Sequence, residues 1–159
     1  MLNDIDDFYY VATQKEVLRY LPDKMMSYDD ICELVNWFLD CYKHNSIDKI
    51  IKFPLAIIDK ETNKLIGDCG LGPSPYIEGE LEIFYILSKD YWGKGIMTEA
   101  ASVILNYGLK KLYLNKIIAT VLPQNIASKR VLEKIGLIYR RTIDVGGYYY
   151  SISKDEYKK

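Results

Sequence analysis

The sequence predicts one α/β or α+β domain in which helices flank a sheet of mixed strands. Two observations predict this fold class: apolar residues recur at helical spacing in some segments, and other short segments are rich in β-branched and aromatic residues. The order along the chain is two helices, three strands, a helix, a strand, a helix and two strands. Because 159 residues suit a single core, we take residues 1–159 as one domain.

The chain is expected to begin with two helices. Residues 3–20 carry acidic and apolar side chains at helical spacing until Leu21-Pro22 stops the segment. Ser27 then begins a second helix, and Asp30 follows at the spacing of a capping box. An apolar stripe continues along this helix as far as the polar residues 43–50.

The remaining elements are separated by turn residues. Glycine and proline at 72–75 break the chain, Gly136 can end a helix in the left-handed conformation, and Gly146-Gly147 can close a hairpin. Between these points we expect strands at 53–58, 65–71, 80–88 and 116–122, helices at 97–112 and 127–135, and a hairpin of 137–143 with 148–153.

The composition narrows the class of protein. Hydrophobic residues make up 49% and charged residues 27% of the chain, and the net charge is −1, as in an ordinary folded protein without a basic surface for nucleic acid. No apolar run approaches the ~20 residues of a membrane span, and no signal-peptide pattern is present. Cys32, Cys41 and Cys69 lack metal or disulfide spacing, and His44 stands alone. We therefore expect a cytoplasmic protein with reduced thiols and no metal site.

The strand at 80–88 leads into a Gly-x-Gly turn and then a helix. Glycines at 93 and 95 let a ligand approach the backbone, and the amides of roughly residues 93–97 would point into the turn at the positive end of the helix. Lys94 adds positive charge, so the turn suits a diphosphate. Gly-x-Gly is also typical of a simple tight turn. Both the Walker pattern and the dinucleotide-binding pattern are incomplete.

Two motifs carry a resemblance to a known family. Tyr91-Trp92-Gly93-Lys94-Gly95, followed by Thr98-Glu99-Ala100, resembles the acetyl-CoA pyrophosphate loop of the GNAT acetyltransferase superfamily. The form is that of the RimJ/RimL-like branch, which contains ribosomal-protein N-terminal acetyltransferases. A second block, residues 123–128 with 131–137, is similar to that branch's Asn-x-x-Ser helix and its Lys-x-Gly-Phe ending. The resemblance spans residues 5–157.

This resemblance implies a binding mode for acetyl-CoA. A mostly antiparallel sheet would hold it between two splayed parallel strands, 80–88 and 116–122. The backbone of Ile86, Leu87 and Ser88 would pair with the pantetheine arm, and Asn125 and Ser128 would reach the pantetheine and the sulfur. The pyrophosphate would be bound by Gly93, Lys94, Gly95, Ile96, Met97 and Thr98. An amine would then attack the thioester carbonyl directly.

The resemblance also implies catalytic residues. Glu82 matches the family's strand glutamate and is our candidate general base, with Glu80 on the same strand face in reserve. Glu82 could equally be a solvent-facing residue in a salt bridge. The family's helix tyrosine is replaced by Leu132, which leaves Ser128 to donate to the thiolate, although a serine there is also typical of a helix start that caps backbone amides.

Three departures from the family pattern stand out. The opening strand has no counterpart, so the strand at 53–58 would become a sheet edge that a second copy of the chain could cover in a homodimer. Asp90 stands where the loop often has Gln or Arg, so we expect it to face away or cap the helix. Phe84 and Tyr85 replace a small-residue pair and would narrow the acceptor cleft.

The leading interpretation is an acetyl-CoA-dependent N-acetyltransferase that acts on a primary amine, either a protein N-terminus or a small molecule. The alternative is a non-catalytic acyl-CoA-binding or regulatory module, which the absent strand and Leu132 would suit. A nucleotide-binding α/β protein is a third interpretation, which the incomplete phosphate-binding patterns disfavour.

Overall fold

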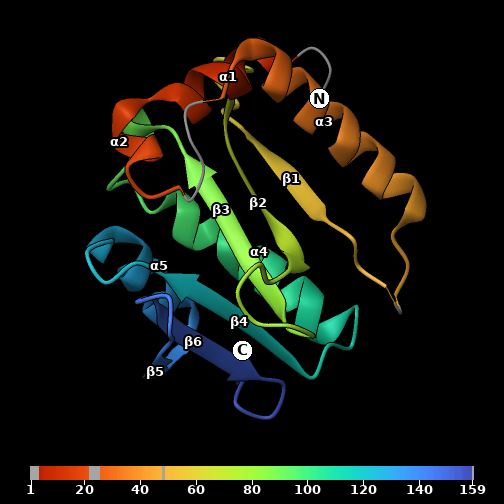
Figure 1. Ribbon diagram of the computed structural model, residues 1–159, viewed down its shortest axis with the longest axis vertical. Coiled ribbons are helices and arrows are strands. Elements are labelled where there is room, and N and C mark those ends of the chain that lie inside the picture. The colour runs from red at the N-terminus through yellow and green to blue at the C-terminus, as the bar shows by residue number, and fades with distance from the viewer. Residues whose placement is uncertain (1–3, 22–25, 48, 159) are drawn as a thin grey trace.

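The computed structural model describes residues 4–21, 26–47 and 49–158 (Figure 1). Its helices are α1 (Ile5–Thr13), α2 (Lys15–Leu18), α3 (Tyr28–His44), α4 (Ile96–Lys110) and α5 (Ile126–Ile135), with a short 3₁₀ helix η2 (Lys89–Tyr91). Its strands are β1 (Phe53–Ile58), β2 (Leu65–Pro73), β3 (Leu81–Leu87), β4 (Lys116–Val121), β5 (Ile138–Thr142) and β6 (Tyr148–Ser153). The predicted mixed α/β fold is confirmed.

The strands form one sheet of six in the order β1-β2-β3-β4-β6-β5. Every neighbouring pair is antiparallel except β3 and β4, which are parallel and share a single register pair, Glu82 with Ile118. The parallel pair therefore separates beyond Glu82, as the sequence interpretation expected. Strand β1 lies at one edge, and no strand precedes it in the described part of the chain.

Helices cover both faces of the sheet. Helix α4 lies behind the sheet in Figure 1 and packs Ala101, Leu105 and Leu109 against the apolar residues of β2, β3 and β4. Helices α1 and α3 cover the other face, where Phe8 meets Phe38 edge to ring at 6.4 Å between centroids. Strand β3 thus lies between these two apolar clusters, whereas β4 packs against α4 on one face and contributes Ile118 to a third cluster with Ile143 and Tyr149 on the other.

The first helical segment differs from its prediction. Residues 3–20 were expected to form one helix, but the chain breaks at Gln14, whose backbone is extended (φ −60°, ψ 126°) between α1 and α2. The Gln14 amide explains the break: Nε2 donates to Ser88 Oγ at 3.0 Å, and Oε1 accepts from the amide of Lys89 at 2.8 Å. This corner ties the N-terminal helices to the end of β3.

The predicted caps are confirmed. Ser27 and Asp30 form a reciprocal capping box at the start of α3, and Gly136 ends α5 at φ +106°. Strand β2 runs on through Gly72 to Pro73, where the sequence predicted a break, because both residues still pair with β3. All three cysteines are free thiols, and Cys41 and Cys69 are buried.

Candidate active site

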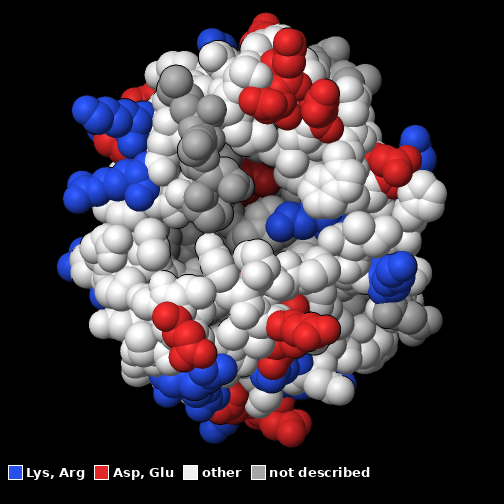
Figure 2. Space-filling view, viewed as in Figure 1, with Lys and Arg blue, Asp and Glu red and all other residues white. Residues whose placement is uncertain are grey.

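Two cavities meet where β3 and β4 separate. The loop cavity, of about 390 Å³, is lined by Trp92, Gly93 and Gly95, by the first turn of α4 and by one side of α5. The Glu82 cavity, of about 420 Å³, lies over β3 and β4 on the other side of the gap. Figure 2 shows a hollow over β2 and β3 with acidic and basic surface beside it. The residues that line both cavities are Tyr20, Leu21, Tyr85, Ile86, Asn125 and Ser128.

The turn before α4 presents free backbone amides. Gly93 and Gly95 have φ of +76° and +81°, and a Cβ at either position would meet nothing within 4 Å, so the space in front of the backbone is open. The first amide of α4 to donate is that of Glu99, to Gly95 O at 3.1 Å. Within the described residues, the amides of 93–98 donate to no other group. This row of N–H groups at a helix N-terminus fits a diphosphate.

The cations beside the turn come from α5 rather than from the turn itself. Arg130 and Lys134 line the loop cavity. Lys94 is not among the lining residues, and its ammonium lies 4.9 Å from the centroid of the Tyr91 ring. The spacing of the two α5 cations, four residues apart on one helix face, is visible in the sequence and could have indicated them.

At the end of β3, some backbone groups face the gap between β3 and β4. Because the Ser88 amide donates to Ile66 O on β2 at 2.8 Å, alternation along the strand turns the backbone groups of Leu87 toward the gap. The Leu87 carbonyl accepts from Trp92 Nε1 at 2.8 Å. By the same alternation, the backbone groups of Ile86 and Ser88 face β2, so of the three residues only Leu87 turns its backbone toward the gap.

Helix α5 begins at the junction of the two cavities. Asn125 caps the helix, and its Oδ1 accepts from the Ser128 amide at 3.1 Å. The capping role that the sequence allowed for Ser128 thus belongs to Asn125. The hydroxyl of Tyr85 donates to Ser128 O at 3.2 Å, and burial raises the pKa of this tyrosine. Tyr85 therefore stays protonated at the junction, a placement that the sequence did not reveal.

Glu82 is buried, and only one of its two carboxylate oxygens is hydrogen-bonded. It is 8% exposed, and its Oε1 accepts from Thr120 N at 2.8 Å and from Thr120 Oγ1 at 2.6 Å. Its Oε2 is also buried and has no hydrogen-bond partner among the described residues. The salt-bridge alternative fits Glu80 instead, since Glu80 pairs with Lys116. One oxygen of Glu82 is therefore fixed, and the other can take a proton from a ligand.

Comparisons with known proteins identify the family of this chain. Residues 1–138 match a family model described as an acetyltransferase (GNAT) domain. The chain belongs to the GNAT acetyltransferase family. An uncharacterized N-acetyltransferase, YnaD of Bacillus subtilis, is 32% identical over 94% of this chain and 87% of its own length. An uncharacterized N-acetyltransferase, p20 of Bacillus licheniformis, is 40% identical over 64% of this chain and 62% of its own length.

Solved structures share the fold of this acetyltransferase. A GNAT-family acetyltransferase from Bacillus anthracis is 25% identical and superposes with a TM-score of 0.78, over 98% of this chain and 92% of that one. RimJ of Mycobacterium smegmatis in complex with CoA-disulfide has a TM-score of 0.80 at 16% identity, over 100% of this chain and 81% of that one. The second likeness shows the fold alone.

Three further observations concern this GNAT acetyltransferase. Leu132, which the sequence resemblance aligned with the family's tyrosine, is 1% exposed and lines the Glu82 cavity without a proton to donate. Across the described residues, no group of three or more His, Cys, Asp or Glu could hold a metal ion. No described helix has the length and apolar character needed to cross a membrane.

Proposed function

We propose that this acetyltransferase transfers the acetyl group of acetyl-CoA to a primary amine and that Glu82 is the general base. The observation that carries the proposal is the buried Oε2 of Glu82, which lacks a partner in the described structure and belongs to the cavity that adjoins the loop cavity. The diphosphate would bind the amides of residues 93–98, with Arg130 and Lys134 supplying positive charge. The Asn125-x-x-Ser128 motif supports placing the chain in the RimJ/RimL-like branch.

A base is needed because only a neutral amine can attack. With a pKa of about 8 for an N-terminus and about 10.4 for a lysine, roughly a tenth of the first and under a thousandth of the second is neutral at pH 7. The ammonium first loses one proton to Glu82 Oε2, and the neutral nitrogen then bonds to the thioester carbonyl carbon. The carbon–sulfur bond then breaks, and the thiolate takes a proton from Tyr85 or Ser128, which meet at the junction. The second proton of the nitrogen replaces the one that the donor hydroxyl gives to the leaving thiolate.

Release of free thiol from acetyl-CoA in the presence of a panel of amines tests this function. Glu82→Gln is expected to lower kcat about a hundredfold or more, because the amide cannot take a proton, while CoA affinity stays unchanged. Glu80→Gln is the matched control, since Glu80 is bound to Lys116 and lines neither cavity. Equal kcat values in the two variants would contradict the role of Glu82.

Leu132, which cannot protonate a thiolate, favours a second candidate, an acyl-CoA-binding module without turnover. The same assay distinguishes the two functions. CoA binding without thiol release for any amine in the panel would support the module and overturn the enzymatic proposal.

A further inference from the structure

Three residues form a row across the sheet beside the acceptor site. Phe53 pairs with Leu71, so Lys52, one position earlier, lies opposite Gly72, and Gly72 pairs with Glu82. Because Gly72 has no side chain, the stem of Lys52 lies over it; a Cβ there would come within 2.7 Å of Lys52 Cδ. The register therefore directs the Lys52 side chain across β2 toward the strand that carries Glu82.

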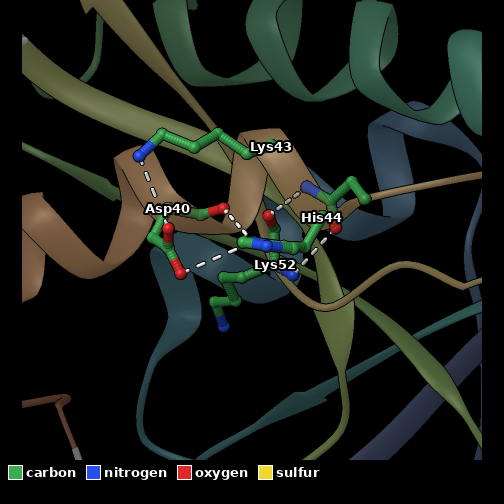
Figure 3. A network of polar contacts seen from close by, with 5 residues as sticks. Asp40, Lys43, His44 and Lys52 are labelled. Carbon is green, nitrogen blue, oxygen red and sulfur yellow. Dashed lines mark hydrogen bonds and ion pairs between the residues drawn. The ribbon is translucent and has the colours of Figure 1, made fainter.

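The side chain of Asn45 holds the backbone at Lys52 by hydrogen bonds. Asn45, at the end of α3, donates to Lys52 O at 2.7 Å and accepts from the amide of Ile51 at 2.7 Å. Figure 3 shows the Lys52 side chain extending away from the side chains of Asp40, Lys43 and His44. The side chain is thus free of the polar groups that hold its backbone.

The ammonium of Lys52 rests on an aromatic ring and lacks a counter-ion. Its Nζ lies 3.7 Å from the centroid of the Phe84 ring. It forms no hydrogen bond or ion pair with any described residue, and Asp68 and Glu82 act on it only from beyond ion-pair distance. Burial lowers the pKa of Lys52, and the two carboxyl groups oppose that change. A partly buried cation without a partner is ready to bind an anion.

The walls of the Glu82 cavity contain little other charge. Among the described lining residues, Lys52 and Glu82 are the only ones with a charged side chain. The apolar and aromatic part of the wall includes Pro73, Pro75, Tyr76, Leu122, Ile143 and Val145. The cavity therefore offers one ammonium and one carboxylate oxygen, each without a partner in the described structure, inside an apolar surround.

We propose that the acceptor is an amine that also carries a carboxylate, as an amino acid does, with an apolar or aromatic remainder. Glu82 takes the proton of the amine, and Lys52 binds the carboxylate as a specificity-determining residue. This inference rests on the proposed function. A polyamine suits the cavity poorly, because it would bring several positive charges to a wall with one carboxylate and would be repelled by Lys52.

The test compares acceptors that differ only in the carboxylate. Phenylalanine against phenethylamine represents a free amino acid, and Ala-Asp-amide against Ala-Asn-amide represents a peptide N-terminus with an acidic neighbour. In the protein itself, at least one carboxylated acceptor is expected to have a kcat/KM higher by about tenfold or more, mainly through KM, as one charge-assisted hydrogen bond would give. No preference within either pair would overturn the proposal.

Variants of Lys52 assign the preference to its charge. Lys52→Met keeps the length of the apolar stem and is expected to abolish the preference, whereas Lys52→Arg keeps the charge and retains it. Lys111→Met removes the same charge from an exposed position outside both cavities and should also retain it. For each protein the kcat/KM of the carboxylated acceptor is divided by that of its uncarboxylated partner. Intrinsic differences between the two amines cancel when these ratios are compared between the proteins. A preference that persists in Lys52→Met, confirmed as folded by its melting curve, would overturn the inference.

Failure of the proposed function would look different. If no amine released thiol, the enzymatic step would be excluded, yet calorimetric titration of phenylalanine and phenethylamine into the CoA-saturated protein would still test Lys52. Tighter binding of phenylalanine that is lost in Lys52→Met would support the carboxylate site. Equal binding of the two amines would overturn it.

Discussion

Replacing Asp68 by asparagine should remove most of the dependence of stability on pH between about pH 4 and pH 7. Asp68 lies in β2 under the N-terminal helices, where it is 5% exposed and borders a small void of about 10 Å³ with Phe8, Phe38 and Ala56. Burial raises the pKa of its carboxyl from the ordinary value of 3.8 to about 7, although Lys52 and the Ile86 amide lower it.

The sign follows from proton binding. Between pH 3.8 and about 7 the folded state holds a proton that the unfolded state has lost, so the free energy of unfolding falls as pH rises. The stabilisation is complete below pH 3.8 and is lost once pH passes about 7. At about 1.4 kcal/mol per pH unit, the loss amounts to about 4 kcal/mol.

Urea unfolding at a series of pH values from 4 to 8 measures this effect. Asparagine is neutral throughout. The free energy of unfolding of Asp68→Asn, relative to that of the parent protein, should therefore rise by up to about 4 kcal/mol from pH 4 to pH 8. The comparison cancels other titrating groups that the two proteins share. Parallel stability curves for the two proteins would refute the assignment of a buried, protonated carboxyl to Asp68.

Two further predictions concern the cavities. Tyr85→Phe should lower kcat by about a hundredfold with little change in CoA affinity if this hydroxyl protonates the thiolate, whereas Ser128→Ala should have the larger effect if the serine does. Steady-state thiol release compares them, and full activity in both variants would exclude either donor. Arg130→Met or Lys134→Met should weaken CoA binding severalfold, and more so at low salt. Lys129→Met, on the same helix but outside the cavity, is the control, and equal weakening there would argue against a local contact.

The parts of the fold that depend on neighbouring residues could be predicted from the sequence. The capping box of Ser27 with Asp30 and the glycine end of α5 each need only a few adjacent residues, and both are confirmed. The loop at residues 93–98 was equally visible, because glycine spacing and a following helix are local features. The break at Gln14 was not, because its partners, Ser88 and Lys89, lie more than 70 residues away.

The parts of the site that depend on register could not be predicted. Lys52 reaches the acceptor cavity only because β1 and β2 pair so that Gly72 lies in its path. Tyr85 was expected to narrow the cleft, but its contact with Ser128 depends on how α5 sits against β3. A sequence pattern does not specify such contacts between distant elements.

Calorimetric titration of CoA tests most directly whether the turn at Gly93 to Gly95 binds the diphosphate. Gly95→Val places a strained side chain at φ +81° in the open space before the amides, and CoA should bind at least about tenfold more weakly, a loss of about 1.4 kcal/mol. Gly79→Val imposes the same kind of strain at φ +76°, at a residue that lines neither cavity, and should bind CoA like the parent protein. Equal CoA affinity in the two variants would contradict a diphosphate site at this turn.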